Sequence, residues 1–343
     1  MNYFRYDRPF TLEQGATLPA LTLAYHTYGR LNADKSNVIW ICHALTANSD
    51  VAAWWPGLVG PGLPFDTDKS FIVCANIIGS CYGSTGPLSI NEETGAPYFD
   101  AFPPITIRDM ARAHMLLREH LGIDTVGLLV GGSMGGYQAL EWCLLEPARI
   151  DRLFLVATAA KETAWGIAIH TAQRLAIEAD PTWLQHDAAA GSAGLKAARA
   201  IAMLTYRNYT AYIEQQSDTD NDKLDGFRAE SYIRHQGNKL AGRFNAYSYW
   251  TLGRAMDSHN IARGRTATVD EALKMISQPT LLIAISNDLL CPPAELEFIH
   301  RHIPNSQLHT ITSIYGHDGF LTEHEAIGAI LKNEKEGEER KRD

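Results

Sequence analysis

Short runs of apolar residues recur along the chain, and turn-forming residues bound each run. Five runs are continuous and rich in leucine, isoleucine and valine, which is typical of parallel strands covered on both faces of a sheet. A sixth run, residues 307–312, alternates more and is expected nearer an edge of the sheet. The five buried strands are predicted at residues 37–42, 71–75, 126–130, 153–157 and 280–285.

Helical patterns separate some of these strands. Residues 106–121 carry apolar side chains at helical spacing and are followed by Gly122, a residue type that ends helices well. Strand, helix and strand in alternation predict an α/β fold with a mostly parallel, doubly wound sheet.

The middle of the chain has a different pattern. It is rich in Ala, Gln, Arg, Tyr and Asn, with an Ala-rich helix candidate at 191–206 and a polar loop at 217–225. Because this region interrupts the strands, we expect a helical cap inserted before the last two strands. The almost wholly charged tail from Asn333 is expected to be frayed or disordered. The predicted organisation is core at 1–163, cap at 164–275, core at 276–333 and charged tail at 334–343.

Composition and charge restrict the class of protein. The 343 residues are 45% hydrophobic and 20% charged, as in an ordinary globular protein, and the formal net charge is −9. A nucleic-acid partner is not expected, because phosphate binding needs a basic surface. No apolar run is long enough to cross a bilayer and no signal peptide is recognisable, so we expect no membrane partner. The five cysteines, an odd number without a C-x-x-C motif, favour a reduced, cytoplasmic protein.

A G-x-S-x-G motif follows the third predicted strand. Residues 131–136 read GGSMGG, and a helical pattern begins directly after them. In the α/β-hydrolase fold this context of strand, tight turn and helix holds a nucleophilic serine above the sheet, here Ser133. A side chain at Gly131 or Gly135 would collide with the neighbouring strand or helix. We therefore predict an α/β-hydrolase fold and a covalent acyl intermediate on Ser133, with an incidental serine in a glycine-rich turn as the alternative.

The fold requires an acid and then a histidine after the serine. Asp288 follows a late buried strand, and its neighbour Asn287 cannot carry the charge that stabilises an imidazolium. His317 follows the last predicted strand in a loop beside a glycine, whereas His324 lies in a helical pattern. We predict a catalytic triad of Ser133, Asp288 and His317, in which the histidine moves the proton.

Two backbone N–H groups are needed to stabilise the oxyanion of acyl transfer. Met134, the residue after the nucleophile, supplies one in this fold. The second comes from the loop after an early strand, and Leu45 is the predicted donor. The same loop could instead be a plain strand exit in which His43 only packs.

Collinear blocks of the chain resemble the homoserine O-acetyltransferase family of methionine biosynthesis, over residues 5–330. The most specific blocks are NIIGSCYGSTGP at 76–87 and GGSMGGYQALEW at 131–142. The first block lacks the glycine motifs of nucleotide loops, so we interpret it as a structural loop near the mouth of the site. Further blocks are HALT at 43–46, GLPFDT at 62–67, IRDM at 107–110, LTYR at 204–207, QGNK at 236–239, RAMD at 254–257 and GHD at 316–318.

The resemblance implies acetyl transfer from acetyl-CoA, a co-substrate, to the hydroxyl of L-homoserine, with no bound cofactor. It implies that Arg207 binds the substrate carboxylate, that Asp318 faces the substrate ammonium group and that Thr46 lines the acyl pocket. Each could instead have a local role, as a surface charge, a helix cap or a turn cap. The resemblance also implies a homodimer formed through cap helices. No metal-binding motif is recognisable, so no metal site is predicted.

Several alternatives share the same residues. A homoserine O-succinyltransferase or a serine O-acetyltransferase of this fold would differ in a few pocket atoms. A serine esterase or other hydrolase would use the same triad with water as acceptor. A catalytically silent scaffold is a further alternative, against which the intact set of Ser133, Asp288 and His317 argues.

Overall fold

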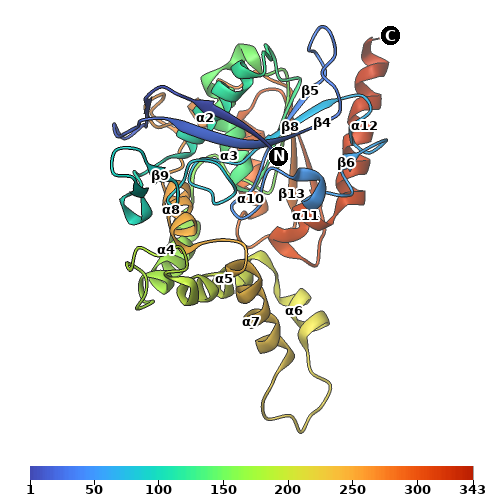
Figure 1. The fold of residues 1–343 in the computed structure, drawn as a ribbon. Coiled ribbons are helices and arrows are strands. Elements are labelled where there is room, and N and C mark those ends of the chain that lie inside the picture. The colour runs from blue at the N-terminus through green and yellow to red at the C-terminus, as the bar shows by residue number, and fades with distance from the viewer. Residues whose placement is uncertain (343) are drawn as a thin grey trace.

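Eight strands form one sheet in the computed structural model, which describes residues 1–342 and the side chains of residues 1–334 (Figure 1). The order across the sheet is β1-β4-β8-β5-β11-β12-β13-β14. β4 pairs antiparallel with both β1 and β8, and all pairs from β8 to β14 are parallel. The strands are β1 Asn2–Tyr6, β4 Leu21–Tyr28, β5 Val38–Cys42, β8 Phe71–Ala75, β11 Leu128–Gly132, β12 Leu153–Val156, β13 Thr280–Ile285 and β14 Ser306–Ile311.

Helices cover both faces of this sheet, because alternate side chains of each strand point to opposite faces. Along β5, Trp40 and Cys42 join the core that includes side chains of α2, α3 and α10. Ile39 and Ile41 join the core that includes side chains of α1, α11 and α12. The helices of the two layers are α1 Val51–Trp54, α2 Ile107–His120, α3 Met134–Leu145, α9 Val269–Lys274, α10 Pro293–His302, α11 Gly319–Thr322 and α12 His324–Arg342.

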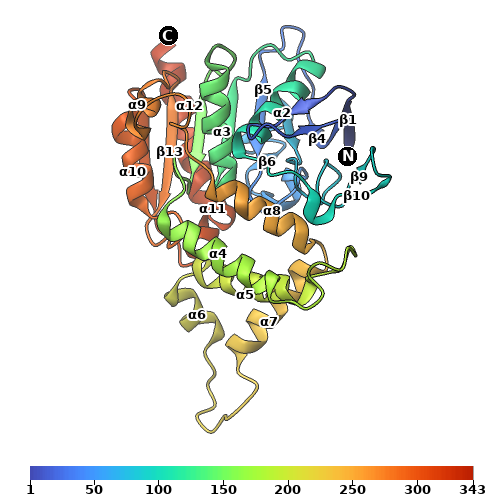
Figure 2. The ribbon, with the colours of Figure 1, turned by 90° about the vertical axis from the view of Figure 1, so that its left-hand side faces the viewer.

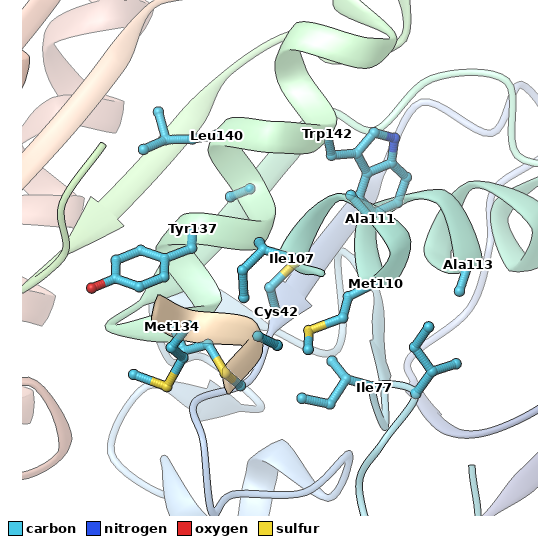
Figure 3. Close-up of a cluster of buried hydrophobic side chains, with 14 of the residues drawn as sticks. Cys42, Ile77, Ile107, Met110, Ala111, Ala113, Met134, Tyr137, Leu140 and Trp142 are labelled. Atoms are coloured by element: carbon cyan, nitrogen blue, oxygen red, sulfur yellow. The ribbon is translucent and has the colours of Figure 1, made fainter. Parts of the chain in front are cut away.

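Figure 3 shows the part of the core around the start of α3. Met134, Tyr137 and Leu140 extend from α3 among side chains that include Ile107 and Met110 of α2. All five side chains are buried. Interiors are packed as densely as organic crystals, so α3 cannot shift against α2 without opening voids. The residue that precedes α3, Ser133, is therefore held on a rigid support.

Six helices lie between β12 and β13, and the first five of them form one group at one end of the sheet (Figures 1 and 2). They are α4 Ala164–Glu178, α5 Ser192–Tyr206, α6 Tyr209–Gln216, α7 Arg228–Ala241 and α8 Ala246–Asp257. α5 contacts α4, α7, α8 and the turn at residues 316–318. α9 lies within the range 164–275 predicted for the cap, yet it contacts α10 beside the sheet. We call residues 164–257 the insertion.

Shorter elements lie in the connecting loops. They are β2 Phe10–Thr11, β3 Thr17–Leu18, β6 Val59–Gly60, β7 Phe65–Asp66, β9 Ile90–Asn91, β10 Ala96–Pro97 and the 3-10 turns η1 Phe99–Ala101, η2 Pro147–Arg149 and η3 Gly316–Asp318. Within residues 1–342, none of the helices combines the length and apolar character needed to cross a bilayer.

The predicted buried strands are confirmed, and β14 lies at an edge of the sheet as its alternating pattern indicated. α12 continues to Arg342 and so spans most of the charged tail for which the sequence predicted a frayed or disordered segment. Glutamate, lysine and arginine, which dominate this tail, are good helix formers. Asp343, the last residue of the predicted tail, lies outside the described residues.

Candidate active site

Ser133 lies at the turn between β11 and α3, with φ of +53° and ψ of −128°. A residue with a side chain rarely adopts a positive φ, so the turn stores backbone strain at this position. Ser133 is the N-cap residue of α3, and the positive end of the helix dipole favours negative charge there. The strand, tight turn and helix predicted around the G-x-S-x-G motif are therefore present.

The glycines of the motif permit close packing around this turn. A Cβ atom on Gly135 would lie 2.1 Å from the carbonyl oxygen of Cys42 in β5. A Cβ atom on Gly131 would lie 2.3 Å from the carbonyl oxygen of Gly135 in α3. Both distances are far shorter than a van der Waals contact, so the predicted collision with the neighbouring strand and helix is confirmed.

His317 and Asp288 form a chain of hydrogen bonds with Ser133. Nε2 of His317 lies 2.9 Å from Oγ of Ser133, and Nδ1 lies 2.6 Å from Oδ2 of Asp288. The other carboxylate oxygen of Asp288 accepts hydrogen bonds from the backbone N–H groups of Leu290 and Cys291, both at 2.8 Å. The three side chains are buried and meet because β11, β13 and β14 end at the same edge of the sheet.

The competing candidates do not reach Ser133. Oδ1 of Asn287 is buried and has no hydrogen-bond partner among the described residues. His324 is the first residue of α12. Among the described residues, the histidine that is hydrogen-bonded to Ser133 is His317, not His324. The structure therefore brings together the three residues that the sequence predicted as a triad.

The pKa of His317 is set by two opposing effects. Burial is the largest single effect and disfavours the charged ring, but the nearby carboxylates, with the charge and hydrogen bond of Asp288 foremost, together raise the pKa of His317 above its ordinary value. The carboxylates of Asp318 and Glu162 raise this pKa further. The ring is thus a stronger base than a free imidazole, which is the property that a proton acceptor for Ser133 needs.

The loop after β5 is held in place by His43. Nδ1 of His43 lies 2.8 Å from the carbonyl oxygen of Ala44, and Nε2 accepts a hydrogen bond from the backbone N–H of Ile77 at 3.2 Å. Burial lowers the pKa of His43 to about 4, so the ring is neutral near pH 7. Gln138 of α3 donates to the His43 carbonyl oxygen at 3.0 Å. These bonds tie the loop to the segment that follows β8 and to α3.

Leu45 and Met134 are the two predicted oxyanion donors. Leu45 follows the loop residue Ala44 and lines the same cavity as Ser133, and Met134 is the first residue of α3. Across residues 1–342, neither backbone N–H donates to a protein acceptor. Both groups are therefore free to bind a ligand oxygen.

A cavity of about 330 Å³ opens at Ser133, and we call it the serine cavity. Thr46 lines it from the loop after β5, and Asp318 lines it from η3 beside His317. Further residues also line this cavity, and one of them, Arg243, is the next candidate after Arg207 for a carboxylate ligand from the sequence. They are Ala44, Ala47, Asn48, Ala53, Trp54, Arg199, Tyr206, Arg243, Phe320 and Leu321.

Arg207, the predicted carboxylate ligand, is not among the residues that line the serine cavity. Its Nε lies 3.0 Å from Oδ2 of Asp318, an ion-pair distance without the geometry of a hydrogen bond. Its guanidinium lies over the Tyr315 ring, 4.8 Å from the ring centre. In this structure Arg207 supports Asp318 from outside the cavity.

Asp288, Cys291 and His317 place potential metal-ligand atoms within 4.8 Å of one another. Both ring nitrogens of His317 are already engaged, one by Asp288 and one by Ser133. Burial raises the pKa of the Cys291 thiol well above its ordinary value, which disfavours the thiolate that binds metals. The donor set fits a hydrogen-bonded triad better than a metal site.

The sheet order, the strained serine turn and the buried serine–histidine–aspartate chain define an enzyme of the α/β-hydrolase fold. A family model described as "alpha/beta hydrolase fold" matches residues 37–324. A homoserine O-acetyltransferase of Cyclobacterium marinum is 46% identical over 330 residues, which cover 96% of this chain and 93% of that protein. One of Chlorobaculum parvum is 47% identical, with 95% and 91% of the two chains covered. The chain belongs to the homoserine O-acetyltransferase family.

Solved structures resemble this chain over nearly its whole length. The homoserine O-acetyltransferase from Bacillus anthracis superimposes with a TM-score of 0.88 at 26% identity, covering 96% of this chain and 95% of that one. Esterase E22 superimposes with a TM-score of 0.87 at 25% identity, covering 97% and 98%. One architecture therefore occurs in proteins named for acyl transfer and in proteins named for ester hydrolysis.

Proposed function

We propose that the protein transfers an acetyl group from acetyl-CoA to the hydroxyl of L-homoserine in methionine biosynthesis, through an acetyl-Ser133 intermediate. The observation that carries the proposal is the hydrogen-bonded chain of Ser133, His317 and Asp288 at the serine cavity. Membership of the homoserine O-acetyltransferase family supports the choice of donor group and acceptor.

The first half-reaction forms the acetyl-enzyme. Oγ of Ser133 attacks the thioester carbonyl carbon while Nε2 of His317 takes the hydroxyl proton. The N–H groups of Leu45 and Met134 stabilise the oxyanion. The intermediate collapses, the C–S bond breaks, and the CoA sulfur leaves with the proton from His317. Asp288 stabilises the imidazolium throughout.

The second half-reaction returns the serine. The acceptor hydroxyl gives its proton to Nε2 of His317 and attacks the acetyl carbonyl carbon. Collapse of the second tetrahedral intermediate breaks the bond to Oγ of Ser133, which recovers the proton from His317. Asp318, beside His317 in the serine cavity, would attract the acceptor's ammonium group. Arg207 would hold the carboxylate of Asp318 in place through their ion pair. Thr46 would line the acyl pocket.

Ester hydrolysis is the second candidate function, because esterase E22 has the same architecture. Water needs neither an ammonium nor a carboxylate contact, so a hydrolase gains nothing from the charges beside His317. The two functions differ in one measurable property, which is whether an amino-acid acceptor accelerates release of CoA.

A matrix of donors and acceptors tests the proposal. Acetyl-CoA and succinyl-CoA are each combined with L-homoserine, L-serine and water, and release of CoA is followed. We expect acetyl-CoA with homoserine to be the fastest pair, and mass spectrometry after brief exposure to acetyl-CoA alone to show one acetyl group on the Ser133 peptide. If homoserine does not change the rate of CoA release, the function is hydrolysis or transfer to another acceptor. Acetyl on a cysteine peptide would contradict the serine intermediate.

A further inference from the structure

The segment that follows β12 lies between the nucleophile and the acid of the triad. β12 is the strand between β11 and β13 in the sheet, and Ser133 and Asp288 follow those two strands. The carboxyl ends of parallel strands share one edge of a sheet, so residues after β12 reach the same region. Thr158 of this segment donates a hydrogen bond to the carbonyl oxygen of Ser133 at 2.8 Å. The segment also brings a further carboxylate to this edge, that of Glu162, which is 5% exposed and directly precedes the N-cap of α4.

The first turns of α4 pack on the loop that holds Asp288. Nε1 of Trp165 donates to the carbonyl oxygen of Leu289 at 2.7 Å. Ile169 packs with Cys291, whose backbone N–H binds Asp288 at 2.8 Å. The segment that precedes α4 is therefore fixed relative to the triad.

The carboxylate of Glu162 is buried without a cationic partner. Oε2 accepts a hydrogen bond from the Tyr137 hydroxyl at 3.1 Å, and Oε1 accepts one from the backbone N–H of Thr163 at 2.9 Å. Within residues 1–334, it forms no ion pair with a lysine, an arginine or a histidine. Burial raises the pKa of Glu162 above its ordinary value, although nearby His170 and the two hydrogen bonds oppose this effect.

Glu141 of α3, another buried glutamate, shows the usual arrangement. Its carboxylate binds Arg108 at 3.0 Å and Arg265 at 2.7 Å. Buried charges are rarely found without such partners, because their removal from water is costly. The unpaired carboxylate of Glu162 therefore favours a neighbouring group that carries, or acquires, positive charge.

His170 of α4 has a carboxylate partner of its own. Its Nδ1 lies 2.9 Å from Oδ1 of Asp257, and the other oxygen of Asp257 lies 2.6 Å from Arg174. His170 is thus engaged elsewhere, which leaves Glu162 available to another cation.

The group near Glu162 that acquires positive charge during the reaction is His317. Its ring is charged whenever it holds the proton of Ser133. Burial lowers the pKa of this ring most strongly, but the charges of Asp288, Asp318 and Glu162 together raise it above the ordinary value. The three carboxylates belong to the loop after β13, to η3 and to the segment after β12, so they act on His317 from different elements.

Asp318 differs from Glu162, because cations lie beside it. Burial raises the pKa of Asp318, and the charges of Arg207 and Arg199 oppose this effect. Nε of Arg207 lies 3.0 Å from Oδ2 of Asp318. Glu162 thus supplies a negative charge that neither arginine pairs with.

We infer that the Glu162 carboxylate acts with Asp288 to stabilise the positive charge that His317 acquires when Ser133 is acetylated. The inference rests on the proposed acetylation of Ser133. It makes Glu162 a positioning residue, which acts through His317 and does not line the serine cavity. Asp288 fixes the ring by a hydrogen bond, whereas Glu162 contributes charge through a protein interior in which Coulomb attraction is stronger than in water. Tyr137 holds this carboxylate from α3, the helix that begins directly after Ser133.

The test removes the charge of Glu162 and keeps its size. Glu162→Gln is mixed with acetyl-CoA without acceptor, and the burst of CoA is followed against pH. The acid limb should move to lower pH, because a less stabilised imidazolium loses its proton more readily. Above that limb the burst should slow by roughly two- to tenfold, because the neutral ring is a weaker base. Glu162→Asp, which keeps the charge, should restore part of both properties.

Glu295→Gln is the matched control. Glu295 of α10 is a partly buried carboxylate whose charge acts on Tyr137 and Cys291, as that of Glu162 does. The control should leave the acid limb and the burst rate unchanged, because its charge is not among the main effects on His317. If urea unfolding shows that Glu162→Gln does not fold, Glu162→Leu replaces it in the same comparison.

The outcomes separate the inference from the proposed function. An acid limb and a burst rate that are unchanged in a folded Glu162→Gln overturn the inference, as does an equal shift in Glu295→Gln. A Glu162→Asp variant that behaves like Glu162→Gln would show that shape matters rather than charge, and would also overturn it. A parent that gives no burst with acetyl-CoA removes the proposed function. Release of nitrophenol from para-nitrophenyl acetate then supplies the same pH profiles, in which the same results decide the inference.

Discussion

At the scale of single residues, Ser133 combines a reactive position with an unfavourable backbone. Its positive φ is a conformation that costs on the order of 1–3 kcal/mol for a residue with a side chain. The turn is tightly packed, since a Cβ on Gly131, Gly135 or Gly136 would lie 2.1–2.3 Å from a neighbouring atom. The strained turn therefore lowers the stability of the fold, and it directs Oγ of Ser133 toward His317.

Two replacements of Ser133 should distinguish the loss of its hydroxyl group from the relief of backbone strain at this position. Ser133→Ala and Ser133→Gly should both lose acetylation, because both lack Oγ. Ser133→Gly should be the more stable of the two, by up to about 1 kcal/mol in the free energy of unfolding, since glycine tolerates positive φ. Urea unfolding of the two variants measures the difference. Equal stability would show that the turn carries no strain.

The raised pKa of His317 predicts the pH dependence of acetylation. The neutral ring is the proton acceptor, so the rate should fall as pH decreases through the pKa of His317, which lies above its ordinary value of about 6.5. Asp318→Asn removes one of the carboxylates that raise this pKa and should move the acid limb to lower pH. The burst of CoA against pH, without acceptor, measures the first half-reaction alone. Glu295→Gln, on α10 outside the serine cavity, is the control and should leave the limb in place.

At the scale of elements, the site depends on how closely α3 approaches β5. Gly135 lies against Cys42 of β5, and Gln138 one turn later bonds the carbonyl oxygen of His43 at 3.0 Å. One helix thus carries Ser133 at its start and fixes the loop that holds Leu45. Movement of α3 would disturb the nucleophile and the oxyanion donor together.

A methyl group at Gly135 should push α3 away from β5. Gly135→Ala should lower the free energy of unfolding by about 1–3 kcal/mol, as overpacking does, and should reduce the CoA burst. Gly242→Ala is a matched control, because a Cβ there meets nothing closer than 3.5 Å and the backbone is helical. The control should change stability by less than about 0.5 kcal/mol. Similar losses in both variants would contradict the crowding argument.

The sequence predicted the elements that bury apolar side chains on both faces, because continuous runs such as 280–285 are unambiguous. It did not predict β4, which is buried at Leu23–Tyr25 but only partly buried from His26 to Tyr28. Chain order and strand ends also constrained Ser133, Asp288 and His317, and the structure brings these three side chains within hydrogen-bond distance of one another. The residues of the insertion that line the serine cavity were harder to predict, because the contact between α5 and η3 depends on how the insertion folds over the sheet.

A signal for Arg199 is nevertheless present in the sequence. On α5 the positions three to four residues away, Leu195, Ala202 and Met203, are buried. Arg199 therefore lies on the apolar face of its own helix, where a charge is unexpected unless it has a partner. Arg207 matched the family's pattern, but a pattern does not show which way a side chain points.

At the scale of the whole molecule, the insertion presents large apolar side chains to solvent. Phe244, Tyr247 and Tyr249 pack inward, which leaves other residues of the insertion to form this surface. The exposed fractions are 58% for Leu175, 60% for Leu204, 78% for Tyr209, 49% for Ile213 and 43% for Phe227. Large apolar side chains that are exposed on one group of helices are candidates for an interaction surface.

We predict that the protein is a homodimer that associates through the insertion. Light scattering at micromolar concentration should give twice the mass of one chain. Leu204→Asp combined with Tyr209→Asp should shift the mass toward that of one chain, because charge is costly in an apolar interface. Lys274→Asp, on α9 beside the sheet, should leave the mass unchanged. A single-chain mass for the parent would contradict the prediction.

The insertion of α4 to α8 between β12 and β13 also separates the residues that acylate Ser133 from other residues that line the serine cavity. Ser133, Asp288 and His317 lie at the ends of strands of the sheet. Arg199, which also lines the serine cavity, lies on α5 of the insertion. Mutations confined to residues 164–257 could therefore change which molecule receives the acyl group, while descendants retain the same way of acylating the serine. A lineage with this architecture can diversify its acceptors, from water to amino acids, without reinventing its chemistry.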